Sequence, residues 1–247
     1  MPIISIMTFN IKFGLAKIKG HTWEKRKASI ISTIKKVSPD FICFQEVNDF
    51  QMEFLKKKLN HYNFTGLYPE PEKSWQDLPV FYKKKYTLVS GEHFFISHTP
   101  KIKSILKGSI WPRQFVSAEF VQEKQKFHII NTHFDFKDSV QKESVNIIVK
   151  KLKNAQPVFI CGDFNADPTG VCHMEFFKKG FKDSFRDIQT PTFHDFTGIP
   201  QKGRIDWILY KGDNISVLRK KIIMDPMNKI FPSDHFPVFS EFRLSEI

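Results

Sequence analysis

The stretch that organises this chain is Pro157-Val158-Phe159-Ile160-Cys161-Gly162-Asp163-Phe164-Asn165, in which an apolar run meets a glycine, an acid and an amide. A short apolar run bounded by proline and glycine is more typical of a buried strand than of a helix. Because side chains alternate along a strand, Asp163 and Asn165 can face the same side. Two interpretations follow. The strand either presents a functional site or simply ends in an Asx turn, since Asp and Asn are common turn residues.

The composition is that of a globular protein that folds without disulfides or structural metals. The chain has 247 residues, of which 41% are hydrophobic and 26% are charged. A chain of this length can bury most of its apolar surface in one core. No internal repeat or linker divides it, so we expect a single domain over residues 1–247 and a monomer.

The charge balance is strongly basic, with a formal net charge of +12 and a pI near 9.5. Such a field favours polyanionic partners: nucleic acid, phosphorylated substrates or an anionic membrane surface. A simpler interpretation stays open for the individual lysine runs, 56–58 and 83–85, which are also typical of solvated surfaces.

The three cysteines, Cys43, Cys161 and Cys172, are odd in number and lack the spacing of metal ligands. This argues against a disulfide framework and against a zinc cluster. We therefore expect a reducing compartment such as the cytoplasm. Residues 1–9 do not resemble a signal peptide, and no apolar run approaches the roughly 18 residues of a membrane span.

Strands outnumber helices in the predicted element order. The amphipathic pattern of residues 23–37, with Ala28, Ile31 and Ile34 on the apolar face, predicts a helix. Further helices are expected at 49–60, 140–153 and 173–178. Strands are expected at 3–9, 41–44, 80–82, 87–96, 114–121, 127–131, 157–161, 205–210, 215–223 and 236–242, while 62–77 and 181–202 read as loops. Consecutive strands with few crossover helices argue against a doubly wound parallel sheet.

Polar side chains repeatedly follow the predicted strands at the point where each one ends. They are Asn10, Glu46, His133, Asp163, Asn165, Asp206, Asp234 and His235. Each residue alone can be a turn or cap residue. If the strand ends converge, however, the cluster combines carboxylate and amide oxygens, which suit Mg2+ or Mn2+, with imidazoles that can donate to phosphate. The chemistry predicted is metal-assisted hydrolysis of a phosphate ester.

The motifs at these positions resemble those of the endonuclease/exonuclease/phosphatase (DNase I-like) superfamily. They occur in the family's order and span residues 8–238: Thr8-Phe9-Asn10, Gln45-Glu46, Asn131-Thr132-His133, Gly162-Asp163-Phe164-Asn165, Arg204-Ile205-Asp206-Trp207-Ile208 and Ser233-Asp234-His235-Phe236-Pro237-Val238. The resemblance implies an α/β fold, a four-layered α/β/β/α sandwich of two mixed sheets flanked by helices. It also implies a hydrolase with its site at one edge of the sandwich.

The resemblance also assigns the metal. It implies that Glu46 is the main ligand of a Mg2+ ion, with Mn2+ as an alternative, and that Asn10 and Asp234 lie near the same cation. In the simpler interpretation, Glu46 is an acid that precedes a helix.

The catalytic roles carry over in the same way. Asp163 would orient or deprotonate the attacking water, and Asn165 would hold that water or a phosphate oxygen. His235 would stabilise the developing charge on the scissile phosphate, Asp206 would orient His235, and His133 would bind a phosphate oxygen from the other side. The alternative for His133 is a core histidine without a catalytic role.

Two segments, 78–82 and 93–100, resemble a bacterial and CCR4-like branch of the family. Two further residues are assigned to substrate binding on this basis. Arg113 follows a Trp-Pro pair and would reach the phosphate, unless it is an ordinary surface arginine. Asp77 stands near the position where many relatives carry a glutamate. Relatives of the branch usually carry a histidine shortly after the aspartate that corresponds to Asp135. This chain has Phe136 and Lys137 there instead.

The substrate is predicted to be a phosphoester, with nucleic acid or a nucleotide favoured by the net charge and by the potential stacking groups Trp75, Trp111 and Phe115. A phosphoinositide phosphatase or sphingomyelinase is the alternative, for which the phenylalanine-rich segment 181–196 would supply an apolar contact with anionic lipid. A binding module without activity is disfavoured by the complete set of polar residues.

Overall fold

The computed structural model describes residues 2–72, 74–153 and 155–245, and their strands form two six-stranded sheets. The first sheet has the order β11-β12-β1-β2-β4-β3. Its strands are β1 (Ile3–Asn10), β2 (Phe41–Gln45), β3 (Tyr62–Thr65), β4 (Val80–Lys83), β11 (Ile215–Ile222) and β12 (Val238–Leu244). Strands β1 and β2 are parallel and the other pairs are antiparallel, so the sheet is mixed.

The second sheet repeats this design with the order β5-β6-β7-β8-β10-β9. Its strands are β5 (Thr87–Phe95), β6 (Gln114–Gln122), β7 (Gln125–His133), β8 (Val158–Asp163), β9 (Lys182–Asp183) and β10 (Asp206–Lys211). Only β7 and β8 are parallel to each other. The stretch on which the sequence analysis opened is therefore an inner strand, β8.

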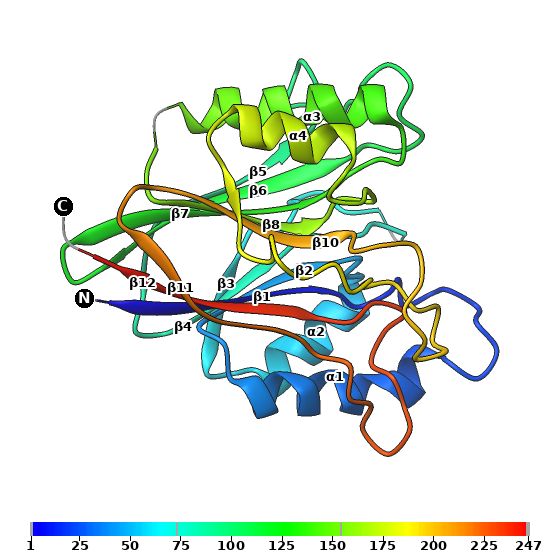
Figure 1. The fold of residues 1–247 in the computed structure, drawn as a ribbon. Coiled ribbons are helices and arrows are strands. Elements are labelled where there is room, and N and C mark those ends of the chain that lie inside the picture. The colour runs from blue at the N-terminus through cyan, green and yellow to red at the C-terminus, as the bar shows by residue number, and fades with distance from the viewer. Residues whose placement is uncertain (1, 73, 154, 246–247) are drawn as a thin grey trace.

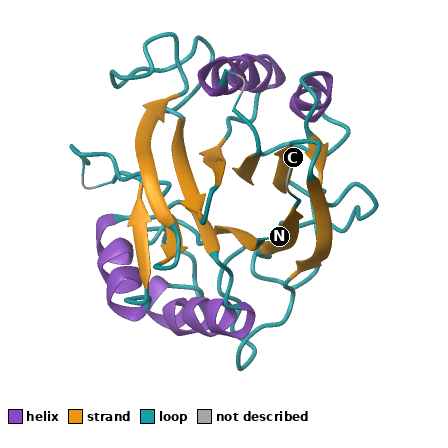
Figure 2. Ribbon diagram, turned by 90° about the vertical axis from the view of Figure 1, so that its left-hand side faces the viewer, coloured by secondary structure: helices purple, strands orange, loops and turns teal. Residues whose placement is uncertain are grey.

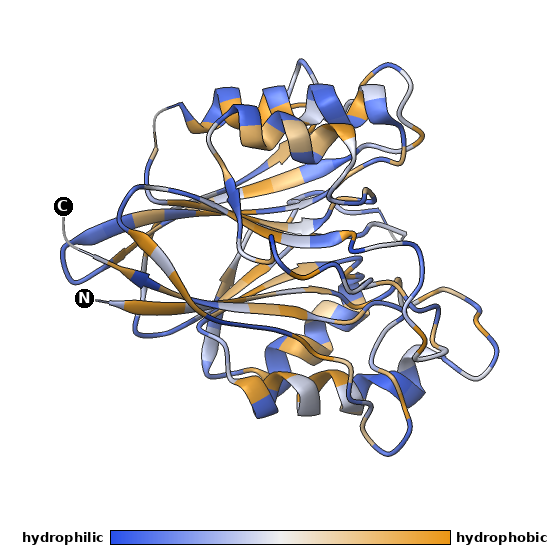
Figure 3. Ribbon diagram, viewed as in Figure 1, coloured by the Kyte–Doolittle hydropathy of each residue, from blue (hydrophilic) through white to orange (hydrophobic). Residues whose placement is uncertain are grey.

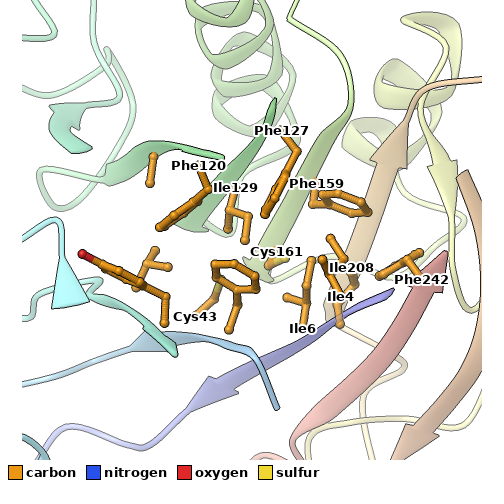
Figure 4. Packing of buried hydrophobic residues seen from close by; sticks show 14 of the residues in the cluster. Ile4, Ile6, Cys43, Phe120, Phe127, Ile129, Phe159, Cys161, Ile208 and Phe242 are labelled. Atoms are coloured by element: carbon orange, nitrogen blue, oxygen red, sulfur yellow. The ribbon is translucent and has the colours of Figure 1, made fainter. Parts of the chain in front are cut away.

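Helices cover the outer face of each sheet (Figures 1 and 2). Helices α1 (Trp23–Val37) and α2 (Asp49–Lys58) pack on the first sheet, and α3 (Asp138–Leu152) and α4 (Val171–Lys178) pack on the second. Three apolar clusters separate the four layers, and the cluster between the sheets contains Cys43, Phe120, Phe159 and Phe242 (Figure 4). The four-layered α/β/β/α sandwich is confirmed.

The helix over residues 23–37 is confirmed, as is the burial of Ile31 and Ile34, but Ala28 was assigned to the wrong face. Ala28 is exposed, whereas Ile30 is buried beside Ile31 and Ile34. Arg26 lies on the same buried face and is almost fully enclosed. Figure 3 shows the resulting alternation of apolar and polar faces on the helices. The hydrophobic periodicity predicted the helix correctly. Because the charged Arg26 lies on the buried face, the pattern of apolar residues did not show which way that face points.

Two short strands were missed and one proposed stacking group is misplaced. Strands β3 and β9 lie in segments that the sequence indicated as loops, because both are edge strands of only four and two residues. Phe115 is fully buried on β6 and stacks on Phe94, so it cannot meet a substrate. No helix in the ranges that the structure describes has the length and apolar character needed to cross a bilayer.

The functional strand ends meet at one edge of the sandwich. The parallel strands β1, β2, β7 and β8 all end there, whereas their antiparallel neighbours β10 and β12 begin there. Gly162 allows β8 to reach this edge beside β7. A Cβ atom at this glycine would lie 2.1 Å from the Thr132 carbonyl oxygen, and its φ of +154° is one that L side chains rarely adopt. Only glycine fits before Asp163.

Candidate active site

The carboxylate of Asp163 lies at the centre of the converging strand ends. Its Oδ2 atom accepts a hydrogen bond of 3.0 Å from Asn10 Nδ2, and it lies 3.5 Å from His133 Nε2 and 3.7 Å from His235 Nε2. Asp163 and His133 end adjacent strands of the second sheet, whereas Asn10 ends β1 of the first. The site is therefore built across the two sheets.

His235 is held as an imidazolium by carboxylates on both ring nitrogens. Its Nδ1 lies 2.9 Å from Asp206 Oδ2, and its Nε2 faces Asp163. Burial alone would lower the pKa of His235, but Asp206 and then Asp163 raise it to about 10. The ring is thus a fixed positive charge at neutral pH, suited to a phosphate oxygen. The contact between Asp206 and His235 is the one that the resemblance implied, and the catalytic role of the pair stays a prediction.

The pKa values of Asp163 and His133, whose side chains lie 3.5 Å apart, are shifted in opposite directions. Burial raises the pKa of Asp163 to about 6, against the opposing effect of His235. A carboxylate with this pKa is ionised at neutral pH and is still basic enough to accept a proton from water. Burial, and then the positive charge of Arg113, holds the pKa of His133 well below its usual range. His133 is therefore neutral, unlike His235.

Asn165 stands in an Asx turn and also faces the cleft. Its backbone N–H donates to Asp163 Oδ1 at 2.9 Å, which is the expected Asx turn. Its φ of +48° lies in the left-handed region, which Asn tolerates better than most residues. Its Nδ2 donates to the Phe134 carbonyl oxygen at 2.9 Å, and the side chain lines the cleft. The turn is what aims the amide into the site.

Glu46 is presented by a strained backbone. Its φ of +63° is unusual for a residue with a Cβ atom, and such strain is found most often at functional sites. Its Oε2 accepts the Phe13 N–H at 2.7 Å, and its Oε1 accepts Asn10 Nδ2 at 3.0 Å. The amide of Asn10 therefore bridges Glu46 and Asp163, and Glu46 faces the cleft.

Asp234 is paired with a lysine that sequence reasoning missed. Lys12 Nζ lies 2.8 Å from Asp234 Oδ2, and Glu46, Asp234 and Asp163 all raise the pKa of Lys12 against the effect of its burial. The Lys12 N–H donates to Asn10 Oδ1 at 3.0 Å. Lys12 lines the cleft, whereas Asn10, Asp206 and Asp234 lie behind it. The sequence offered one signal for Lys12: it stands two residues after Asn10, at the predicted end of a strand.

Arg26 joins the loop that carries Lys12 to the loop that carries Asp234 by hydrogen bonds. Its Nη1 donates to the carbonyl oxygens of Ile11 at 2.8 Å and Pro232 at 2.6 Å. Burial lowers the pKa of Arg26 to about 10, so it keeps its charge at neutral pH. A charged residue on the apolar face of a predicted helix was the signal for this role.

The donor set at Glu46 fits a hard divalent cation. Carboxylate oxygens are the ligands that Mg2+ prefers, and Glu46 faces the cleft. The negative charge of Glu46, Asp234 and Asp163 also attracts a cation here, as its effect on the ammonium of Lys12 shows. In the described residues, ligand atoms of Asp163, Asp206 and His235 also lie within 4.8 Å of one another. Within this group the imidazole of His235 already has a carboxylate partner, because its Nδ1 lies 2.9 Å from Asp206 Oδ2. Glu46, with Asn10 and Asp234 near it, therefore stays the predicted ligand set of the cation.

Arg113 projects into the same cleft from the loop before β6. Its side chain is 12% exposed, and its Nε lies 3.8 Å from Asp135 Oδ2. The carboxylate of Asp135 is fully buried, and it also accepts hydrogen bonds from the Ser109 hydroxyl at 2.8 Å and the Phe136 N–H at 2.8 Å. Arg113 is thus no freely solvated surface arginine. The cleft has a volume of about 750 Å³, and Lys12, Lys103, Arg113 and Lys202 line it.

Asp77, the other predicted substrate contact, lies behind the cleft. Its Oδ1 accepts the Tyr68 N–H at 2.9 Å and Trp75 Nε1 at 3.1 Å. Burial raises the pKa of Asp77 to about 6. The structure therefore places Asp77 as an anchor for the segment that carries Trp75, a residue that does line the cleft.

Gln45 and Asn131, neighbours of the catalytic residues in their motifs, join the two sheets. Gln45 Nε2 donates to Asn131 Oδ1 at 2.7 Å, and Asn131 Nδ2 donates to the Phe44 carbonyl oxygen at 2.7 Å. Both side chains are fully buried. This pair fixes the position of β2 against β7 directly beneath Glu46 and His133.

Comparison with known proteins gives one family. The model of the Endonuclease/Exonuclease/phosphatase family matches residues 7–235. An uncharacterised protein of Acanthamoeba polyphaga mimivirus is 30% identical over 162 residues, which is 60% of each chain. The CCR4-Not complex 3'-5'-exoribonuclease subunit Ccr4 of Aspergillus niger is 21% identical over an alignment that covers 94% of this chain. The chain spans 60% and 49% of the lengths of these two relatives.

Solved structures agree on the fold. An endonuclease/exonuclease/phosphatase family protein from Bacteroides thetaiotaomicron superposes with a TM-score of 0.90 at 23% identity and covers 99% of both chains. A mannosyl-6-phosphatase from the same organism superposes with a TM-score of 0.88 at 24% identity, over 98% of this chain and all of the other.

Proposed function

Because this chain belongs to the endonuclease/exonuclease/phosphatase family, a family of hydrolases, we propose that it is a divalent-metal-dependent phosphodiesterase that acts on nucleic acid or nucleotides. The observation that carries this proposal is the environment of Asp163. A buried carboxylate with a raised pKa lies beside one charged and one neutral imidazole, at a cleft with four cationic side chains.

The proposed reaction is in-line attack of water on phosphorus. A P–O bond to the water oxygen forms as the P–O ester bond opposite it breaks, and the leaving oxygen takes a proton from solvent to depart as an alcohol. Asp163 accepts the proton of the attacking water, and Asn165 orients that water through its amide. Bound at Glu46, Mg2+ or Mn2+ would supply a Lewis acid for the phosphate.

The negative charge that develops on the phosphate is met by cationic side chains. The imidazolium of His235 and the guanidinium of Arg113 stabilise it from fixed positions, and neutral His133 binds a phosphate oxygen. Asp206 and Asp135 act as positioning residues, because each holds one of these cations from the side away from the cleft.

The lipid alternative loses its main support. Of the four phenylalanines in the segment that was to form an apolar rim, Phe181, Phe185 and Phe196 are buried, and Phe193 is half-buried and lines the cleft. A phosphatase for a small sugar phosphate is the second candidate. The cleft volume lies within the roughly 300–1,000 Å³ that is usual for small-ligand sites. The mannosyl-6-phosphatase with the same fold supports it further.

The test is digestion of labelled single- and double-stranded DNA and RNA with Mg2+, beside release of phosphate from mannose 6-phosphate. We expect cleavage of a nucleic acid, and a loss of about 100-fold or more in turnover for Asp163→Ala and His235→Ala. Asp225→Asn, which removes an exposed charge paired with Lys36, is the matched control. If no nucleic acid is cut while mannose 6-phosphate is hydrolysed, the second candidate replaces the first.

A further inference from the structure

Two large aromatic side chains stand exposed beside Arg113 at the cleft. Trp111 is 53% exposed and Phe136 is 60% exposed, and both line the cleft. The guanidinium carbon of Arg113 lies 5.5 Å from the Trp111 ring centroid and 5.7 Å from that of Phe136. These three side chains, which we call the Trp111 platform, combine flat π faces with a planar cation.

The platform is held in place by one buried carboxylate. Asp135 accepts the Ser109 hydroxyl and, on its other oxygen, the N–H groups of Phe136 at 2.8 Å and Lys137 at 3.2 Å. The Ser109 Oγ also lies 2.8 Å from the Trp111 carbonyl oxygen, so its single proton is shared between the two acceptors. A single anchor therefore fixes the backbone beneath both rings, so a ligand that stacks there meets a largely preorganised surface.

The platform also lies close to the reacting centre. Asp163 and Glu46 both act electrostatically on Arg113, and all three line the same cleft. The Arg113 Nε is buried and makes no hydrogen bond within the described residues. A ligand bound here would consequently carry a phosphate at Asp163 and a flat group next to that phosphate.

We propose that the Trp111 platform stacks an unpaired nucleobase adjacent to the scissile phosphate, which makes single-stranded nucleic acid the substrate. Stacking on aromatic rings and arginine is the usual means by which proteins hold unpaired bases. In a duplex both faces of a base are already covered by its neighbours. A sugar phosphate offers no comparable π face. This inference rests on the proposed function and deepens it.

The test measures binding, so that it does not depend on turnover. Fluorescence anisotropy with EDTA present, which stops metal-dependent hydrolysis, would compare two labelled octanucleotides: oligothymidylate and the same strand with two abasic residues at its centre. We expect the wild type to prefer the base-bearing strand by roughly 5- to 150-fold. Trp111→Ala should abolish that preference and Trp111→Phe should restore it.

Ile110→Ala is the matched control, because Ile110 is 61% exposed on the same loop but does not line the cleft. It should keep the wild-type preference. Equal affinity of the wild type for the two strands, absence of binding to either, or an undiminished preference in Trp111→Ala would each overturn the platform. If Trp111→Ala also weakened binding of the strand with abasic residues, the platform would be contacting the sugar and not the base, and the proposal would be rejected. Oligouridylate run in parallel distinguishes RNA from DNA.

The two proposals can fail separately. Loss of the binding preference with nucleic acid still cleaved would reject the platform and leave the phosphodiesterase. Base-dependent binding without any cleavage would reject the phosphodiesterase and leave the platform.

Discussion

The pair formed by Asp206 and His235 gives the most exacting prediction. Asp206→Asn keeps an oxygen that can accept the hydrogen bond from Nδ1 but removes the nearer of the two carboxylates that contact the ring. We expect the pKa of His235 to fall, because the remaining charge on Asp163 is farther away, at 3.7 Å rather than 2.9 Å.

The size of the change follows from the pKa itself. The difference between the ordinary value of 6.5 and about 10 corresponds to about 5 kcal/mol in favour of the charged ring. Asp206, Asp163 and Asp234 supply this stabilisation against burial, and Asp206 is the largest contributor. Removing at least a third of it would lower the pKa of His235 by at least about one unit.

The assay is an NMR titration of the His235 ring in metal-free protein, followed by the pH dependence of kcat/KM. In both, the alkaline transition should move to lower pH in Asp206→Asn. Asp225→Asn removes a negative charge at an exposed site and should leave the transition where it is. A His235 pKa that stays near 10 in Asp206→Asn would refute the assignment of the imidazolium to this pair.

Three further outcomes are expected. Asp77→Asn should raise the free energy of unfolding by about 2–3 kcal/mol at pH 8 and by little at pH 4. The folded pKa of Asp77 is raised to about 6, so the native state loses stability as pH rises through that value; equal shifts in thermal melts at both pH values would contradict this. Glu46→Gln should weaken Mn2+ binding at least about tenfold in calorimetry, whereas Glu53→Gln on the exposed face of α2 should not. Asn165→Ala should be about 1 kcal/mol less stable than Asn165→Gly in urea, because only glycine accepts the left-handed backbone without strain, while both should lose turnover; equal stabilities would argue against the strain.

Sequence patterns located the edge at which the candidate catalytic groups meet, although they misplaced some groups relative to their strands. Asp206, Asp234 and His235 were expected to follow strands, but Asp206 begins β10 and the other two precede β12. Strand ends at Asn10, His133 and Asp163 were predictable from the apolar runs before them, and the parallel pairing of their strands brings them together. The same patterns did not reveal Lys12, whose place depends on a left-handed turn after β1. Nor could they separate Phe115, buried between layers, from Trp111, exposed four residues earlier.

The two predicted substrate contacts show most clearly what local sequence patterns cannot predict. Arg113 and Asp77 both stand next to strands and aromatic residues in the sequence. Arg113 enters the cleft because buried Asp135 holds it there, whereas Asp77 turns inward to bind the Trp75 indole. Both outcomes depend on contacts between segments more than 20 residues apart or on the path of a loop, and neither leaves a local periodic signal.

The buried contact between Gln45 and Asn131 has a consequence for how the protein should fail on heating. Glu46 and Lys12 belong to one sheet and Asp163 and His133 to the other, so the reacting groups stay aligned only while the two halves do not slide past each other. The apolar layer between them resists separation but is indifferent to small sideways displacement, since hydrophobic contact has no preferred direction. The hydrogen bond between the Gln45 and Asn131 amides is directional, so it resists the sideways displacement of one sheet relative to the other. Weakening it should uncouple catalysis from folding, and turnover would be lost at temperatures where the sandwich is still intact.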